Sequence, residues 1–240
     1  MDARAPVRRA QQRGTLTRTD LLQAALREFA SVGFEAASTR AIAAGAGVRQ
    51  GQLTYHFETK DDLWRATVDH LFERFDTEFA AGLASTIGAG IDGAVTDAVS
   101  AFEASVRALV RAVSKLPELN RVMVHEATDD SDRLTWIVET HVRRRFEQLA
   151  ALWAEVKARG ATHLDADPVV LYYCLLGAAS LLYVNAPEAR KLEGGKRTSG
   201  AAAAARVEAH ADTLVAMLLG PQRTPTKRRP AKRNNRTKGT

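Results

Sequence analysis

Cysteine is nearly absent from this chain of 240 residues. Because Cys174 is the one cysteine, an intramolecular disulfide and a metal site built from several cysteines are both excluded, as is typical of proteins in a reducing cytoplasm. No apolar run follows the arginines near the start, so we expect no signal peptide. The chain is long enough to bury a sizeable core in one large or two small domains.

The motifs of common enzymes are also missing. The chain contains no G-x-S-x-G elbow, no phosphate-binding glycine loop followed by Lys-Ser/Thr, and no H-E-x-x-H. His125-Glu126 with His141 comes nearest to a metal-binding group, but scattered histidines are more often surface or core residues. We therefore expect no catalytic site, no metal and no cofactor, and we interpret Cys174 as a small buried hydrophobic residue.

Long uncharged runs are limited to one. No residue from Pro168 to Pro187 is charged, and at about 1.5 Å per residue a helix of this length could cross a bilayer. The prolines and Asn185 shorten the usable length, and no second such run exists. We therefore favour a helix covered on both sides, by its own core and by a second copy of the chain, with no membrane association.

The net charge of +6 is concentrated at the two ends. Eight Lys or Arg residues and no acid follow Gln222, and five arginines occur in the first twenty residues, which leaves a mildly acidic body. Such ends are either solvated, disordered tails or arms that add contacts to nucleic-acid phosphates without reading sequence.

Apolar residues recur at spacings of three and four through most of the chain, which predicts an all-α fold. We expect one continuous helix from the cap at Ser131 to about Arg159, and we interpret the glycine-rich stretch 82–93 as a frayed end and a loop. The other long helices are expected at about residues 17–32, from Thr59 onward, 95–113, 167–187 and 203–219, and a short helix is expected at 118–127.

Residues 39–60 predict two short helices joined by a tight turn. Ser38 or Thr39 can cap the first helix, and Gly47 lies where it stops, in a conformation that only glycine adopts cheaply. Residues 50–56 form the second helix, with Leu53 and Phe57 facing inward. Its outward residues suit a reader of the DNA major groove, because Gln pairs with adenine, threonine methyls contact thymine, and Tyr, His and Lys bind phosphates. The alternative is a helical hairpin with a solvated polar face.

From Thr17 to about Leu63 the chain resembles the DNA-binding domain of the TetR family of bacterial regulators. The residues that carry the resemblance are Leu22, Ala25, Phe29, Gly33, Phe34, Thr39, Ile42, Ala43, Ala46-Gly47-Val48, Gly51, Leu53, His56-Phe57, Lys60 and Leu63. The resemblance implies a three-helix DNA-binding head, a larger helical domain for ligand binding and dimerisation, and a homodimer that usually represses. The dimer would pair the helices at about 167–187 and 203–219 with their copies and bind a palindromic operator in double-stranded DNA.

Carried over to this sequence, the family's base-reading positions are Gln50, Gly51 and Gln52, and its phosphate-contacting or positioning ones are Thr39, Tyr55, His56 and Lys60. The sequence departs from the family at Thr54, where a tyrosine is usual, and at Arg49, where a Ser or Thr cap is common. The full set of predicted DNA-binding residues is Thr39, Arg40, Arg49, Gln50, Gly51, Gln52, Thr54, Tyr55, His56 and Lys60.

The resemblance also implies a small-molecule effector pocket between the helices of residues 92–187. Phe102, Met123, His141 and Tyr172 lie on or beside apolar faces there and are our candidates, although residues in such positions are more often ordinary core. The abundance of Ala, Leu and Val favours a hydrophobic effector.

These patterns predict a disordered basic arm (1–15), a helix-turn-helix DNA-binding domain (16–60), a helical effector-binding and dimerisation domain (61–220) and a disordered basic tail (221–240). The expected protein is a cytoplasmic, ligand-responsive repressor. Three alternatives stay open: an activator of the same family, an architectural protein that binds DNA with little specificity, and an α-helical enzyme with an incidental head.

Overall fold

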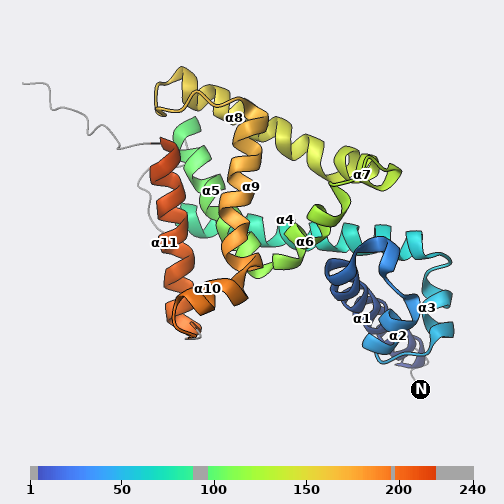
Figure 1. Ribbon diagram of the computed structural model, residues 1–240. Coiled ribbons are helices and arrows are strands. Elements are labelled where there is room, and N and C mark those ends of the chain that lie inside the picture. Colours follow the sequence, from blue (N-terminus) through green and yellow to red (C-terminus); the bar gives the residue numbers. More distant parts are fainter. Residues whose placement is uncertain (1–4, 89–96, 196–197, 220–240) are drawn as a thin grey trace, which may run out of the picture.

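The computed structural model describes residues 5–88, 97–195 and 198–219, and within these ranges every regular element is helical (Figure 1). The expected all-α class is confirmed. The predicted tail at 221–240 lies outside the described residues. The elements are α1 (Ala5–Ala36), α2 (Thr39–Gly45), α3 (Gln50–His56), α4 (Lys60–Gly88), α5 (Ala98–Lys115), α6 (Pro117–Glu126), α7 (Asp132–Ile137), the π-helical turn η1 (Val138–Val142), α8 (Arg143–Ala158), α9 (Pro168–Val184), α10 (Ala186–Leu192) and α11 (Gly200–Leu219).

The head consists of α1, α2 and α3, with the first turns of α4 (Figure 1). The Ser38 side chain accepts a hydrogen bond from the Ala41 amide, 3.4 Å away, and so caps α2 as predicted. Gly47 has φ +70°, the left-handed conformation expected at the end of α2. The inward faces also follow the predicted pattern, because Ile42, Leu53 and Phe57 are all buried.

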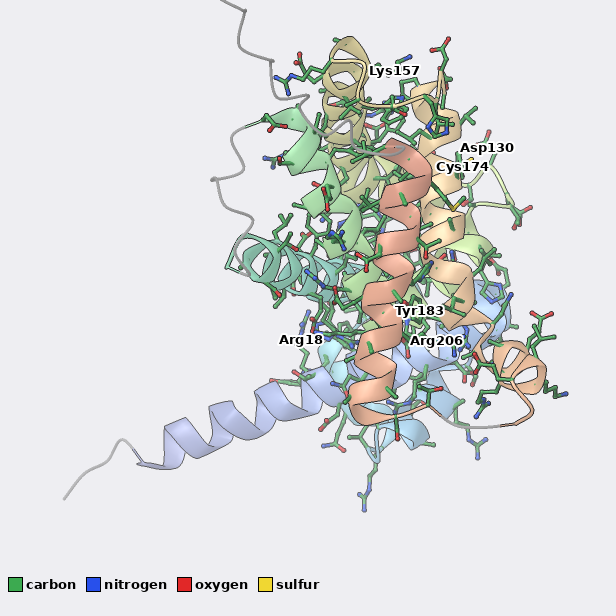
Figure 2. All side chains as sticks on the ribbon, turned by 90° about the vertical axis from the view of Figure 1, so that its left-hand side faces the viewer. Arg18, Asp130, Lys157, Cys174, Tyr183 and Arg206 are labelled. Atoms are coloured by element: carbon green, nitrogen blue, oxygen red, sulfur yellow. The ribbon has the colours of Figure 1, made fainter. Side chains whose placement is uncertain are left out.

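The first helix begins earlier than predicted. α1 starts at Ala5, so the expectation of a disordered arm is wrong for residues 5–15, which are helical. Figure 2 shows this N-terminal part of α1 extending away from the rest of the molecule. Gly33, with φ 75° and ψ 175°, interrupts the helical conformation at the predicted end of the helix. The helix at residues 5–15 was not predicted because these residues lack an apolar stripe, and such a stripe indicates packing against a core and not helicity itself.

The long helix α4 connects the head with the body (Figure 1). Its start is fixed by reciprocal bonds: the Thr59 hydroxyl oxygen accepts from the Asp62 amide at 3.0 Å, and the Asp62 carboxylate accepts from the Thr59 amide at 3.1 Å. Leu63 to Phe72 contribute to the hydrophobic cluster of the head, which also includes Val122 of α6 and Ile137 of α7, whereas Phe75 belongs to the cluster of the body. One continuous helix is therefore built into both clusters.

The predicted loop at the glycine-rich stretch begins too early, because α4 continues through Gly82 to Gly88. The reason is close packing against α5: a β-carbon at Gly82 would lie 2.9 Å from the Cα of Ala108. The glycine thus permits a close helix crossing instead of ending a helix.

The helix predicted from Ser131 to about Arg159 is interrupted by the π-helical turn η1. The amide of Arg143 donates to the carbonyl of Val138, five residues earlier, which is the π-helical pattern. Leu134, Val138, Val142 and Phe146 follow one another at spacings of four, which drift from the 3.6-residue period of an α-helix. The wider π turn accommodates this drift.

In the body, α9 and α11 run side by side (Figures 1 and 2). Leu171, Leu175 and Ala179 face the core from α9, but Tyr173 is 65 % exposed and Leu181 is 52 % exposed. Cys174 is also exposed, so its interpretation as a buried hydrophobic residue is wrong for the single chain.

Among the described residues no single helix has both the length and the apolar character needed to cross a membrane. The consecutive helices α9 and α10 would suffice only together, and they are bent by 70° at their junction.

Candidate nucleic-acid interface

Helix α3 is a short polar helix held on the head by two buried residues. Leu53 and Phe57 are 3 % and 6 % exposed, whereas Tyr55, between them on the opposite side, is 87 % exposed. The remaining nine predicted DNA-binding residues are all exposed or partly exposed. Arg40, Arg49, Gln50, Gly51, Gln52 and Thr54 are exposed, while Thr39, His56 and Lys60 are partly exposed. The structure therefore gathers all ten on the α2–α3 corner and the start of α4.

The polar side chains of α3 are ordered by local hydrogen bonds. Gln50 Nε2 donates to Thr39 Oγ1 at 3.1 Å, linking α3 to the first residue of α2. Gln52 Oε1 accepts from the backbone amide of Arg49 at 3.2 Å, at the N-terminus of α3. This bond is the half of a capping box in which the third helical residue accepts from the amide of the N-cap residue, and it satisfies a different donor from the one that a Ser or Thr cap would satisfy.

Lys60 points toward the end of α1. Its ammonium donates to the carbonyl of Glu35 at 3.1 Å and lies 4.6 Å from the centre of the Phe34 ring. The side chain thus joins α4 to α1, and a phosphate contact by Lys60, as the resemblance implies, would use the ammonium hydrogens that this bond leaves over.

A shallow hollow of about 570 Å³ lies beside α3. It is lined by Ala37, Ser38, Thr39, Gln50, Leu53, Thr54, Phe57, Glu58, Thr59 and Lys60. Glu58 was not among the predicted residues, and its carboxylate introduces a negative charge next to the base-reading positions. Arg18 was also missed: its guanidinium lies 5.4 Å from the centre of the Phe57 ring, next to the end of α3. No motif indicated either: Glu58 lies in the turn between α3 and α4, and Arg18 is brought beside Phe57 by the packing of α1.

The four candidate effector residues do not line one common pocket but belong to separate clusters of side chains. The Phe102 ring is fully buried 5.3 Å from Trp153, and the Tyr172 ring is 5.7 Å from Phe146, both in the body. Met123 instead packs against the cluster of the head. Burial raises the pKa of Tyr172 to about 12, so its hydroxyl stays protonated at neutral pH.

His141, the fourth candidate, belongs to the π turn and packs on α4. Its ring is stacked on Phe72 at 4.3 Å, and its Nε2 lies 2.9 Å from Asp69 Oδ1. Burial lowers the pKa of His141, although the Asp69 carboxylate opposes that shift. Glu126, which the sequence suggested as a metal ligand together with His141, pairs with Arg133 at 3.0 Å, whereas His141 pairs with Asp69. Within the described ranges no three His, Cys, Asp or Glu side chains are grouped as metal ligands.

The fold and this corner define a helix-turn-helix DNA-binding protein with a larger helical body. Comparison with known proteins supports the same class. The sequence profile described as "Bacterial regulatory proteins, tetR family" matches residues 21–67. The HTH-type transcriptional repressor KstR2 of Rhodococcus jostii (strain RHA1) is 32 % identical over 154 residues, which cover 62 % of this chain and 70 % of that protein. The chain belongs to the TetR family of bacterial regulatory proteins.

Solved structures share the fold over most of the chain. The ketosteroid transcriptional regulator KstR2 of Mycobacterium tuberculosis superposes with a TM-score of 0.61 at 16 % identity, covering 85 % of this chain and 95 % of that one. AibR, solved in complex with isovaleryl coenzyme A and operator DNA, superposes with a TM-score of 0.58 at 20 % identity, covering 85 % and 99 %. Fold, corner and family together make this chain a DNA-binding transcriptional regulator.

Proposed function

We propose that this chain is a dimeric cytoplasmic repressor, released from a palindromic operator by a small molecule with an apolar acyl or ring portion. In this proposal the head (16–60) binds DNA, the body (61–220) dimerises and binds the effector, and no reaction is catalysed. The observation that carries the proposal is the polar, exposed face of α3, which two buried side chains fix to the head. Such a helix presents amide groups to base edges in the major groove.

The dimer is supported by the exposed apolar residues of α9. Val170, Tyr173 and Leu181 are each more than half exposed in the single chain, and α11 runs beside α9 (Figure 1). Covering this face with the same face of a second copy buries apolar area and gives a two-fold symmetric pair. Two recognition helices related in this way fit half-sites about one DNA turn, or a multiple of it, apart.

The effector class is supported by the relatives and by the apolar body. One relative is described as a ketosteroid regulator and another was solved with isovaleryl coenzyme A. In our proposal the effector separates rings that now touch, Tyr172 from Phe146 and Phe102 from Trp153. The protonated Tyr172 hydroxyl can then donate to a carbonyl or thioester oxygen.

The switch requires that the effector bind one conformation better than the other, because equal affinity for both states shifts nothing. Helix α4 is the natural link, since Phe72 packs in the head cluster and Phe75 in the body cluster. A change in the body that tilts α4 therefore moves α3 and alters the distance between the two recognition helices.

The experiment that tests the function is selection of random duplex DNA by the purified protein at moderate salt, followed by sequencing. An enriched palindrome is the expected result. Retention without enrichment would instead indicate an architectural protein that binds phosphates with little sequence preference. Placing the enriched site before a reporter gene distinguishes a repressor from an activator.

The effector part is tested by displacement of the enriched DNA, measured by fluorescence anisotropy. Isovaleryl coenzyme A and a ketosteroid are the probes, and free coenzyme A is the control without an acyl group. We expect displacement by a probe with an apolar portion and none by the control. Tyr172→Phe should weaken the response to the probe and leave the DNA affinity unchanged. Displacement by free coenzyme A alone, or by a highly charged metabolite alone, would overturn the proposed effector class.

A further inference from the structure

The two hydrophobic clusters of this chain do not follow the domain boundary that its sequence predicts. Val122 of α6 and Ile137 of α7 are buried, and both belong to the cluster of the head. The other cluster holds Phe75 and buried residues of α5, α8, α9 and α11. Figure 1 shows α6 and α7 between the head and the helices α5, α9 and α11. By their packing, α6 and α7 therefore belong with the head.

Within the described residues, the chain passes from one cluster to the other at three places. The first lies inside α4, between Phe72 and Phe75. The second is Leu116, where φ −130° and ψ 57° interrupt the helical conformation between α5 and α6. The third is η1, whose π-helical bonds interrupt the α-helical pattern before α8. Two of the three passages thus coincide with a break in regular α-helix, which is where hinges are found.

These passages divide the chain into two units. The head unit comprises residues 17–72 and 117–142, and the body unit comprises residues 75–88, 98–116, 143–184 and 200–219. Ion pairs brace each unit internally. In the head unit, Arg133 of α7 lies 3.2 Å from the carboxylate of Glu35 in α1. In the body unit, Arg111 of α5 donates to the carbonyl of Gly82 in α4 at 3.1 Å and to Glu208 in α11 at 2.6 Å.

The bonds between α6 and α9, one helix from each unit, are of a weaker kind. Asn120 Nδ2 donates to Ser180 Oγ at 3.0 Å, and Arg121 donates to the carbonyl of Val184 at 3.3 Å. Leu119 packs against both clusters at their boundary. Single hydrogen bonds contribute little net stability, because bonds to water replace them, so these contacts can part or change partners while both clusters stay buried.

We infer that the head unit, α6 and α7 included, moves as one piece in the switch, with the α5–α6 junction and η1 as its hinges. The inference rests on the proposed effector response and adds where the effector acts. Met123 and His141 lie in the head unit, whereas Phe102 and Tyr172 lie in the body unit. An effector that contacts residues of both units has a different affinity for each arrangement of the units, which is what the switch requires.

The division is tested by hydrogen exchange of the full chain, followed amide by amide at increasing urea below the unfolding transition. The amides of α6 and α7 should share the protection and the urea dependence of those in α1 and the first half of α4, and should differ from those in α5 and α9. Grouping of α6 and α7 with α5 and α9 would overturn the inference. One common opening for all helices would overturn it too, because two units would then not exist.

Two matched variants sharpen this test. Ile137→Ala shortens a fully buried side chain of the head unit, and Leu171→Ala shortens one of the body unit that is 1 % exposed. In Ile137→Ala the amides of α1 and α6 should exchange at least about 30-fold faster, the usual consequence of such a truncation. The amides of α6 and α7 should follow those of α1, not those of α5, in both variants. The smaller truncation Ile137→Val should show the same grouping if Ile137→Ala does not fold.

The motion is tested with spin labels on full chains that carry Cys174→Ser, diluted with unlabelled chains so that distances within one chain are measured. The labels are attached at exposed positions through Gln23→Cys on α1, Thr135→Cys on α7 and Ala154→Cys on α8. On addition of the enriched duplex, the distance from Gln23 to Thr135 should stay constant, whereas that from Gln23 to Ala154 should shift by more than about 2 Å. Shifts of both distances, or of neither, would overturn the inference. Failure of the unmodified chain to enrich any DNA refutes the proposed function instead, and the exchange experiment needs no DNA.

Discussion

The guanidinium of Arg133 lies 3.9 Å from the centre of the Phe34 ring and joins α7 to the end of α1. The same guanidinium donates to Glu126 at 3.0 Å and lies 3.2 Å from the Glu35 carboxylate. The Glu126 side chain is only 4 % exposed, so Arg133 neutralises a carboxylate that is buried between the head and the body. Arg133 therefore makes both a cation–π contact with Phe34 and a buried ion pair with Glu126 where α7 meets α1.

Replacement of Arg133 by leucine should lower the free energy of unfolding by about 3–5 kcal/mol, because the substitution leaves the Glu126 carboxylate buried and unpaired. Urea unfolding followed by circular dichroism measures the change. Arg143→Leu is the matched control: it breaks the pair with Glu139, in which both side chains are 53 % exposed, and should change the unfolding free energy much less, because water solvates both groups. Equal losses in the two variants would contradict the buried role of Arg133.

Gly82→Ala should destabilise the protein by about 1–3 kcal/mol, the usual range for a methyl group forced into a packed contact. The new β-carbon would lie 2.9 Å from backbone of Ala108, which cannot rotate away as a side chain would. Gly45→Ala serves as the comparison, since its β-carbon would meet only the Ala24 side chain at 3.7 Å. Gly45→Ala should stabilise by about 0.5–1 kcal/mol in the same urea titration. A neutral Gly82→Ala would show that α4 and α5 can separate freely.

The unfolding free energy should fall as the pH drops below about 6.5. Burial lowers the pKa of His70, His141 and His210 from the ordinary value of 6.5. Just below pH 6.5 the unfolded chain therefore binds more protons than the folded chain, and protonation favours unfolding. The stabilising contribution is complete above pH 6.5 and is lost as the pH falls through the lowered pKa values. Urea titrations at about pH 7.5, 6 and 5 measure the slope. His210→Gln should flatten it, and an unchanged or reversed slope would contradict the assignment.

Much of this fold could be predicted because the relevant signals are local. Ser38, Gly47, Leu53 and Phe57 have the predicted roles, since a cap, a left-handed glycine and an inward face depend only on near neighbours in sequence. The features that could not be predicted depend on distant partners. Gly82 is explained only by Ala108, which is brought beside it by the folding of the chain.

At the nucleic-acid interface, too, the contacts between separate helices could not be predicted from the sequence. The sequence identified the outward set of α3, and the comparisons bear out the family, but nothing in the sequence showed that Lys60 would turn toward Glu35 or that Gln50 would bond to Thr39. These bonds join separate helices, so they depend on the angle at which those helices meet. The exposure of Cys174 was missed for a different reason, because an apolar helix gives no sign of which face its own chain covers.

A single charge on α9 tests the proposed dimer. Leu181 is 52 % exposed in the single chain and lies on the face that we expect a second copy to cover. Leu181→Arg would bury an unpaired charge there, so the dimer should weaken by at least about 100-fold, because such burial costs several kcal/mol. Sedimentation equilibrium over a range of concentrations measures the dissociation constant.

Leu192→Arg is the matched control, because Leu192 on α10 is 84 % exposed and lies outside α9 and α11. It should leave the dimer intact, although it replaces the same residue by the same charge. DNA binding should follow the dimer: Leu181→Arg should bind a palindrome hardly better than one half-site, since two linked heads gain affinity that separate heads lack. A dimeric Leu181→Arg with full palindrome affinity would place the interface elsewhere and would leave the apolar face of α9 without a partner.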